Sequence, residues 1–319
     1  MSAPSALPLE PSPERLRNPA LRYVLATRPA FLSITLAGCL LGFATAFHDG
    51  VPFRAGAAEV SLLLALLAHA GINVLNDYFD HLNGTDAANV GRIYPYTGGS
   101  RFIQNGVLSP GRTLAFGLLL FAFVIAGGLW LVAQSGAGLF WIGLAGLITG
   151  WAYSAPPLKL NARGLGEPCV VAGFLLIPAG ADYVQRASFA PLPWLASLPF
   201  ALLAANILFI NQFPDREADA LAGKRHWVVR LEPEQAAGVY ALIALAAAGA
   251  LVAAVAADAL PVWALSSLAA MLPSVGAARQ LMQNCRQPRL LAPAIRLTLL
   301  AAHLHAIMLA LILMTESGK

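Results

Sequence analysis

The sequence predicts an all-α, multi-pass transmembrane bundle of about nine helices with its N-terminus in the cytoplasm. Hydrophobic residues make up 58% of the chain and charged residues only 11%, whereas charged residues are roughly one quarter of a soluble domain. The mean hydropathy of +0.67 agrees with this class. Because backbone polar groups in lipid must be satisfied within helices or closed barrels, the long apolar stretches predict helices.

Nine apolar segments approach or exceed the length of about 20 residues that spans the hydrocarbon core of a bilayer. They are residues 30–48, 57–80, 112–133, 138–154, 168–185, 193–213, 236–257, 261–278 and 295–314. Residues 1–29 contain Pro and Arg but no apolar core with a cleavage site, so they are predicted to be a cytoplasmic tail with room for an amphipathic surface helix. Residues 30–319 then form one transmembrane domain, because little water-facing surface remains for a soluble one.

The basic residues predict the orientation of this bundle. All but three of the 20 Lys and Arg residues lie in the N-terminal tail or near the ends of the second, fourth, sixth and eighth predicted helices. The positive-inside rule places those segments in the cytoplasm, and we expect a multi-pass protein of the inner (cytoplasmic) membrane. In such a protein the net charge of +4 reports topology, so no nucleic acid is expected as a partner beside the lipid bilayer.

The second predicted helix ends in an unusual polar stretch, HAGINVLNDYFDHLNGTD, at residues 69–86. Asn73 and Asp77 are four residues apart, as are Asn76 and Asp80, so these side chains share one face of a helix. A third carboxylate, Asp86, follows closely. The helix is therefore predicted to carry amides and carboxylates at its cytoplasmic end.

The sixth predicted helix ends in a similar stretch, NILFINQFPDREADALAGKR, at residues 206–225. Asn211, Asp215 and Asp219 recur at four-residue steps and face one way, whereas Glu217 points elsewhere. The two stretches form a weak internal repeat, and each is followed by a Gly-containing loop with basic residues. The two helix ends are therefore predicted to act together.

These acidic helix ends have two interpretations. Carboxylates where a helix leaves the membrane need no purpose beyond solvation. Here, however, five of the 16 acidic residues fall in the two clusters, and amides one turn earlier should still lie at membrane depth. Polar groups there are costly and usually functional, so we predict a site.

The chemistry of the clusters indicates Mg²⁺ and a diphosphate. Mg²⁺ prefers oxygen ligands and often bridges one or two carboxylates to the phosphates of a substrate. Carboxylates alone would repel a diphosphate, so a metal and nearby cations are needed. The basic residues expected to contact its outer oxygens are Arg92, Arg101, Lys159, Lys224 and Arg225.

Three motifs, in order along the chain, resemble those of the UbiA superfamily of intramembrane prenyltransferases. NDYFDHLNGTD is similar to the first Asp-rich motif of that family, DREAD to the second, and YSAPPLKL to the motif after the fourth helix. The resemblance covers almost the whole chain. Finer features, including RGLGEP and DREADALAGKR, resemble the branch that prenylates 1,4-dihydroxy-2-naphthoate in menaquinone synthesis.

This resemblance implies a Mg²⁺-dependent enzyme that transfers a polyprenyl group from polyprenyl diphosphate to a hydroxylated aromatic acid. It implies that Mg²⁺ is held by Asp77, Asp80, Asp215 and Asp219, and it gives Asp86 a place in the site. Substrate contacts are further expected at Asn73, Asn76, Tyr153 and Asn211. By contrast, His226 is expected to be a solvated loop residue, and Glu167 and Asp182 to be helix-end residues.

Other functions remain open at this level. Another aromatic acceptor, such as 4-hydroxybenzoate, would leave the same motifs in place. An ion-coupled transporter would also explain paired polar helices and a weak repeat, although transporter sites tend toward the bilayer midplane. A non-catalytic lipid-binding subunit is disfavoured because all four of the Asp residues assigned to the metal are present.

Overall fold

The computed structural model describes residues 9–316. Residues 1–8 of the predicted tail and residues 317–319 lie outside the described part of the chain. Between residues 9 and 316 all regular secondary structure is helical, which confirms the all-α prediction.

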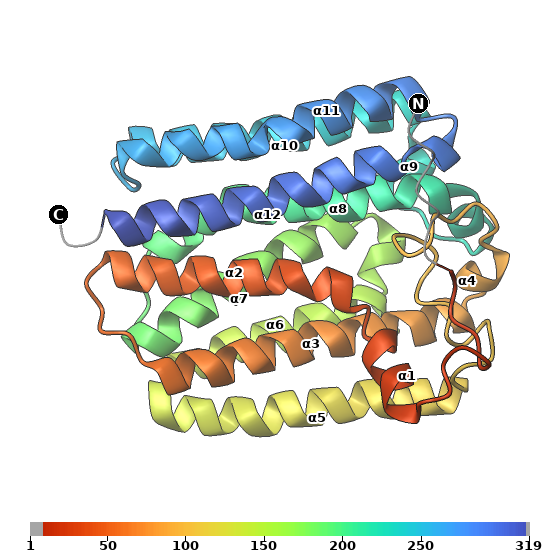
Figure 1. Cartoon of the computed structure of the whole chain (residues 1–319), viewed down its shortest axis with the longest axis horizontal. Helices are drawn as coiled ribbons and strands as arrows, with labels where there is room; N and C mark the ends of the chain where they lie inside the picture. The colour runs from red at the N-terminus through yellow and green to blue at the C-terminus, as the bar shows by residue number, and fades with distance from the viewer. Residues whose placement is uncertain (1–8, 317–319) are drawn as a thin grey trace.

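Nine helices of at least 17 residues run side by side through the described part of the protein (Figure 1). They are α2 (Pro29–His48), α3 (Ala55–Leu82), α5 (Pro110–Ser135), α6 (Gly138–Ser154), α7 (Gly166–Arg186), α8 (Leu192–Leu221), α10 (Pro233–Ala256), α11 (Leu268–Asn284) and α12 (Ala292–Thr315). Seven are long and apolar enough to cross a membrane. The other two, α6 and α11, have 17 residues each, about 26 Å at 1.5 Å per residue. The chain is therefore a multi-pass membrane protein.

The acidic helices α3 and α8 continue beyond the ends predicted from hydropathy, residues 80 and 213. Polar side chains on one face do not interrupt backbone hydrogen bonding, so both helices extend to a residue with a left-handed backbone. Gly84 (φ 84°) and Gly223 (φ 78°) follow their last turns, and a glycine in this conformation commonly ends a helix. Asp77 and Asp80 thus lie within the last turns of α3, and Asp215 and Asp219 within those of α8, whereas Asp86 follows in the short helix α4 (Thr85–Ala88).

The eighth predicted helix differs from the observed one at its start. Pro261 is followed by the 3₁₀ segment η2 (Val262–Ser267), and α11 begins only at Leu268. The prediction began this helix at residue 261 because hydropathy does not distinguish a 3₁₀ turn from an α-helical one.

The largest buried apolar cluster lies on one side of the bundle, where α8 contacts α7, α10 and α12, and α2 contacts α7 and α12. Phe200, Phe209 and Tyr240 are completely buried there. On the other side α3 packs along α5, and α6 packs against α7. A cavity lies among these last four helices, together with α2 and α8.

The segments that join α3 to α5, α6 to α7 and α8 to α10 lie at one end of the bundle, at the right of Figure 1. The short helix α4 (Thr85–Ala88) and the segment that leads to α5 lie there, beside the ends of α3 and α8. The N-terminal segment with α1 (Pro19–Ala26) packs on this loop through Leu16 and Phe102. These segments cover the acidic end of the cavity.

Candidate active site

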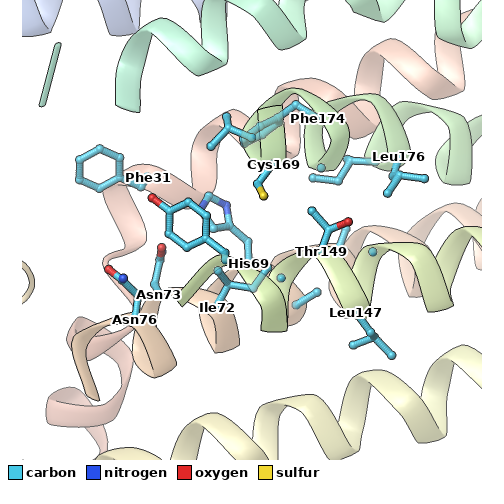
Figure 2. Close-up of a pocket in the computed structure, with 18 of the residues that line it drawn as sticks. Phe31, His69, Ile72, Asn73, Asn76, Leu147, Thr149, Cys169, Phe174 and Leu176 are labelled. Atoms are coloured by element: carbon cyan, nitrogen blue, oxygen red, sulfur yellow. The ribbon is translucent and has the colours of Figure 1, made fainter. Parts of the chain in front are cut away.

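The cavity has a volume of about 700 Å³, within the range of about 300–1,000 Å³ typical of ligand pockets. Carboxylates from both clusters, namely Asp80, Asp86, Asp215 and Asp219, line it. Figure 2 shows the amides of Asn73 and Asn76 on one side of the view and apolar side chains such as Leu147 and Leu176 on the other. The cavity therefore has a polar end and an apolar channel.

The first cluster is held by the end of α3 and the loop that follows it. Both carboxylate oxygens of Asp77 accept from the backbone N–H of Ser100, at 3.2 and 3.3 Å. Asp80 accepts from the side-chain amides of Asn76 at 3.2 Å and Asn83 at 3.1 Å. Asn76 and Asp80 thus pair as their spacing predicts, and Asp77 is directed toward the loop.

Gly99 brings Asp86 close to Asp77. It has φ 69°, and a Cβ atom there would lie 2.7 Å from Oδ2 of Asp86 and 3.0 Å from Oδ1 of Asp77. Only a residue without a side chain fits between these two carboxylates in this backbone conformation. Burial, with the nearby carboxylates of Asp80 and Asp77, raises the pKa of Asp86 well above its usual value.

The second cluster is held by the end of α8. Asp215 accepts from the side-chain amide of Asn89, and from the backbone N–H of Gly98 at 3.2 Å. Asp219 lies 3.0 Å from Nε2 of His226, which is 2% exposed. His226 is therefore a buried partner of the site, and its assignment as a solvated loop residue is wrong.

Lys224 joins the two clusters. Its ammonium lies 2.9 Å from Oδ1 of Asp80 and 3.0 Å from Oδ1 of Asp219. Burial lowers the pKa of Lys224, but the two carboxylates outweigh this and raise the pKa above its usual value. The site therefore contains a permanent positive charge between its two acidic helix ends.

Comparison with known proteins identifies this arrangement. The model of the UbiA prenyltransferase family matches residues 31–313, nearly the whole chain. The chain belongs to the UbiA prenyltransferase family. This membership decides between the enzyme and transporter hypotheses, because the family is one of prenyltransferases.

Individual UbiA relatives agree with the match. The chain is 31% identical over 232 residues to a 2-carboxy-1,4-naphthoquinone phytyltransferase from Synechocystis, covering 70% of each chain. It is 30% identical to a 1,4-dihydroxy-2-naphthoate octaprenyltransferase from Haemophilus influenzae, covering 64% of this chain and 67% of the relative. A UbiA homologue from Archaeoglobus fulgidus bound to GPP and Mg²⁺ has the same fold, with a TM-score of 0.55 at 17% identity over 92% of this chain and 99% of that chain.

The donor atoms of this UbiA site suit a Mg²⁺ ion whose coordination is completed by the phosphates of a substrate. Between residues 9 and 316 no three His, Cys, Asp or Glu side chains are grouped to hold a metal, and the ammonium of Lys224 lies between Asp80 and Asp219. Mg²⁺ needs only one or two carboxylates when phosphates complete its shell. The carboxylates of Asp77 and Asp86 approach each other at Gly99, and Oδ1 of Asn211 is buried without a hydrogen-bond partner. These hard oxygen donors fit Mg²⁺.

The remaining predicted contacts divide into two groups. Asn73, Asn76, Tyr153, Asn211 and Lys224 line the cavity. Asn73 does not bind Asp77 but donates to the carbonyl of Thr27 at 3.0 Å.

The other predicted basic residues do not line the cavity: Arg92, Arg101, Lys159 and Arg225. Arg92 binds Glu10 at 2.7 Å, and Arg101 donates to the backbone carbonyl of Asp86. Lys159 and Arg225 are exposed. The first two therefore hold the loop, whereas the last two face outward.

Several site residues escaped the sequence prediction. Arg28 lines the cavity, its Nη2 donates to the carbonyl of Tyr96 at 3.3 Å, and its buried Nε has no partner. Glu167 lies in the first turn of α7, as predicted for a helix-end residue, and it also accepts a hydrogen bond from Gln212, a residue of the cavity lining, at 2.8 Å. One signal for Arg28 was available, because it is the basic residue that directly precedes the first apolar segment.

Proposed function

We propose that this prenyltransferase joins the polyprenyl group of a polyprenyl diphosphate to 1,4-dihydroxy-2-naphthoate, with loss of the carboxyl group, in menaquinone synthesis. The observation that carries the proposal is the cavity that connects carboxylates of both acidic helices to an apolar channel. The names of the two relatives, both enzymes of naphthoate-derived substrates, support this acceptor.

The diphosphate of the donor belongs at the polar end of the cavity. Lys224 and Arg28 supply fixed positive charge there, and charge-assisted hydrogen bonds to phosphate are among the stronger ones in proteins. Mg²⁺ held by the carboxylates of Asp77, Asp80, Asp215, Asp219 and Asp86 would neutralise the diphosphate as it leaves. Lys224 would then exchange its carboxylate partners in part for phosphate oxygens.

Cleavage of the C–O bond moves its electron pair onto the diphosphate and leaves positive charge on the allylic carbon. An apolar, enclosed channel keeps water from this carbon. The ring of Tyr153 lines the cavity, so its face is available for cation–π attraction to the same charge. Asn73, Asn76 and Asn211 also line the cavity, and the buried Oδ1 of Asn211 has no hydrogen-bond partner among the described residues.

The naphthoate ring supplies the electrons for the new C–C bond. If bonding occurs at the ring carbon that carries the carboxylate, that group leaves as CO₂ and its bonding electrons restore the aromatic ring. No protein base is then needed at that carbon. With 4-hydroxybenzoate as the alternative acceptor, a ring proton would be lost instead, and a base such as Asp86 would be required.

We further propose that the polar end of the cavity faces the cytoplasm in the inner membrane. Arg92, Arg101, Lys224 and Arg225 all lie in loops at the polar end. The positive-inside rule places such loops in the cytoplasm, where a charged diphosphate and an aromatic acid are both dissolved or at the membrane surface.

The test is the mass of the product formed from purified protein, Mg²⁺, farnesyl diphosphate and either acceptor. We expect a prenylated, decarboxylated naphthoquinol from 1,4-dihydroxy-2-naphthoate. Asp77→Ala and Asp215→Ala should abolish product, whereas Glu217→Ala should not, because Glu217 is exposed on the same helix as Asp215. Product from 4-hydroxybenzoate alone would contradict the acceptor assignment.

A further inference from the structure

The short helix α1 exposes an apolar face in the described part of the protein. Leu21, Val24 and Leu25 have the spacing of one helical face, and their exposed fractions are 42%, 54% and 38%. The opposite face carries Tyr23 and Ala26, which pack against the loop beneath α1. Apolar surface is unfavourable in water, so we expect the outer face of α1 to lie against an apolar phase.

The position of α1 brings this face to the membrane interface. Thr27 and Arg28 join α1 to α2, and α1 lies at an angle to the long helices (Figure 1). The ring of Tyr23 contacts the ring of Phe116 on α5, with centroids 4.9 Å apart. Phe116 is six residues from the start of α5, about 9 Å along that helix. Helix α1 therefore lies beside the first two turns of a membrane helix.

The length of α5 shows that these turns lie at the interface. The helix has 26 residues, about 39 Å at 1.5 Å per residue, which exceeds the hydrocarbon core of about 30 Å. The first turns of α5 therefore lie where lipid headgroups meet acyl chains, and α1 lies beside them.

Basic residues surround the exposed face of α1. Residues 9–28 contain four arginines and two glutamates. Arg15 and Arg17 are exposed directly before α1, and Arg112 is exposed at the start of α5. An apolar helical face accompanied by basic residues is typical of a helix that lies in the plane of an anionic membrane surface.

The segment that leads to α1 is bound to the loop over the acidic site. Glu10 accepts from Nε of Arg92 at 2.7 Å and from the side-chain amide of Asn105 at 3.2 Å. The same amide donates to the carbonyl of Pro11 at 2.9 Å. The N-terminal segment is thus connected to residues 92 and 105, on both sides of the part of the loop that contacts the site.

That part of the loop positions a carboxylate on each acidic helix. The backbone N–H of Gly98 donates to Asp215 at 3.2 Å. The backbone N–H of Ser100 donates to Asp77 at 3.2 Å. Release of the N-terminal segment would therefore loosen the loop that holds both carboxylates.

We propose that α1 binds the anionic phospholipid surface of the bilayer and thereby holds residues 92–108 closed over the acidic site. The outer face of α1 enters the boundary between headgroups and acyl chains, while Arg15 and Arg17 contact phosphodiester groups. Prenyl transfer then depends on the lipid composition of the membrane. This effect on transfer rests on the proposed function, whereas the binding of α1 to lipid does not.

The first test uses the unmodified protein in nanodiscs of phosphatidylcholine, either alone or mixed with an equal amount of phosphatidylglycerol. Backbone deuterium uptake is mapped by mass spectrometry. We expect phosphatidylglycerol to slow uptake in residues 9–28 and 92–108, and to leave residues 257–261 unchanged, because these follow α10 at the opposite end of the bundle. Equal uptake at residues 9–28 in the two lipid mixtures would overturn the proposal.

Two double variants remove the proposed lipid contacts. Arg15→Gln with Arg17→Gln should weaken binding of the segment to the anionic surface by about 25-fold, at about fivefold for each arginine. Leu21→Gln with Val24→Gln removes apolar contacts and introduces residues of good helix propensity. We expect both double variants to raise deuterium uptake in residues 9–28 and 92–108 and to slow prenyl transfer in nanodiscs that contain phosphatidylglycerol.

The matched controls make the same changes outside these two segments. They are Arg279→Gln with Arg289→Gln, and Leu221→Gln with Leu290→Gln, all at exposed residues. Neither control should change uptake in residues 9–28 or the rate of transfer. If the loss of two arginines before α1 slowed transfer equally with and without phosphatidylglycerol, the proposal would be overturned. If uptake depended on lipid but the unmodified protein transferred no prenyl group, the proposed function would be contradicted instead.

Discussion

Replacing Lys224 by Met tests whether a cation is required between the two acidic helices. The ammonium lies 2.9 Å from Asp80 and 3.0 Å from Asp219. Side-chain exposure is only 9% for Lys224, 12% for Asp80 and 7% for Asp219. Methionine preserves most of the length of the side chain but removes the charge, so the two carboxylates would face each other without a counter-ion.

The expected magnitude follows from this burial. Removing one partner of a buried ion pair costs about 3–5 kcal/mol, because a charge remains unpaired. For a chain of 319 residues, an unfolding entropy of about 2.1 cal/mol/K per residue gives about 0.7 kcal/mol/K, so Tm should fall by about 4–8 °C. Mg²⁺ should reverse much of this loss, since a ligand at roughly one hundred times its Kd stabilises by about 2.7 kcal/mol.

The assay is thermal unfolding of the detergent-solubilised protein with EDTA and then with increasing Mg²⁺. Arg225→Met is the matched control, because Arg225 is the next residue and is exposed. We expect Lys224→Met to lose stability in EDTA and to gain more from Mg²⁺ than the unmodified protein, while Arg225→Met changes little. An unchanged Tm in EDTA, or an equal gain from Mg²⁺ in both proteins, would refute the reasoning.

Two further predictions concern the loop over the site. Gly99→Ala should abolish transfer, because the new Cβ atom would lie 2.7 Å from a carboxylate oxygen of Asp86. Gly106 has a similar φ of 70° and no heavy atom within 4 Å of its Cβ position, so Gly106→Ala should cost only about 1–2 kcal/mol of stability and keep activity. Equal losses of activity in the two variants would contradict this prediction. Partial burial raises the pKa of Glu10, but hydrogen bonds from Arg92 and Asn105 outweigh this effect and leave the pKa below its usual value. The ionised Glu10 carboxylate therefore stabilises the folded protein by less than about 1 kcal/mol at pH values above the pKa of Glu10 in the unfolded chain. This stabilisation is lost as the pH falls through the pKa of Glu10 in the folded protein. Glu10→Gln should expose the N-terminal segment to protease at neutral pH, and the exposed Glu14→Gln should not.

The parts of the site that the sequence predicted are those fixed by one helix. The pairing of Asn76 with Asp80 depends only on a four-residue spacing within α3, and it was found. One pairing within a single helix was nevertheless missed: Asp182 and Arg186 on α7 have the same spacing, and the guanidinium of Arg186 donates to both carboxylate oxygens of Asp182, at 2.8 and 2.9 Å. The assignment of Asp182 as a simple helix-end residue is therefore wrong, and the sequence contained the signal that corrects it.

The parts that escaped prediction depend on how distant segments pack. Lys224, in the loop after α8, lies close to Asp80 of α3 although the two residues are far apart in the sequence. Asn73 binds Thr27, 46 residues away, instead of Asp77. Arg92 binds Glu10, 82 residues away, so a residue expected to bind diphosphate instead fixes the N-terminal segment on the loop. No spacing within one segment carries such information.

The lengths of α3 and α8 explain why the reaction would occur at the membrane surface. Both helices continue past their apolar stretches and end at Gly84 and Gly223. Asp80 is the last residue of the predicted apolar stretch of α3, and Asp219 lies in the part of α8 beyond its apolar stretch, so Lys224 in the following loop reaches both. At the bilayer midplane these three charges would be far more costly. At the level of the loops the diphosphate of the donor can enter from water while the isoprenoid tail of the donor remains in the apolar channel. The charged part of the donor therefore stays near water, and the apolar part stays in an apolar environment.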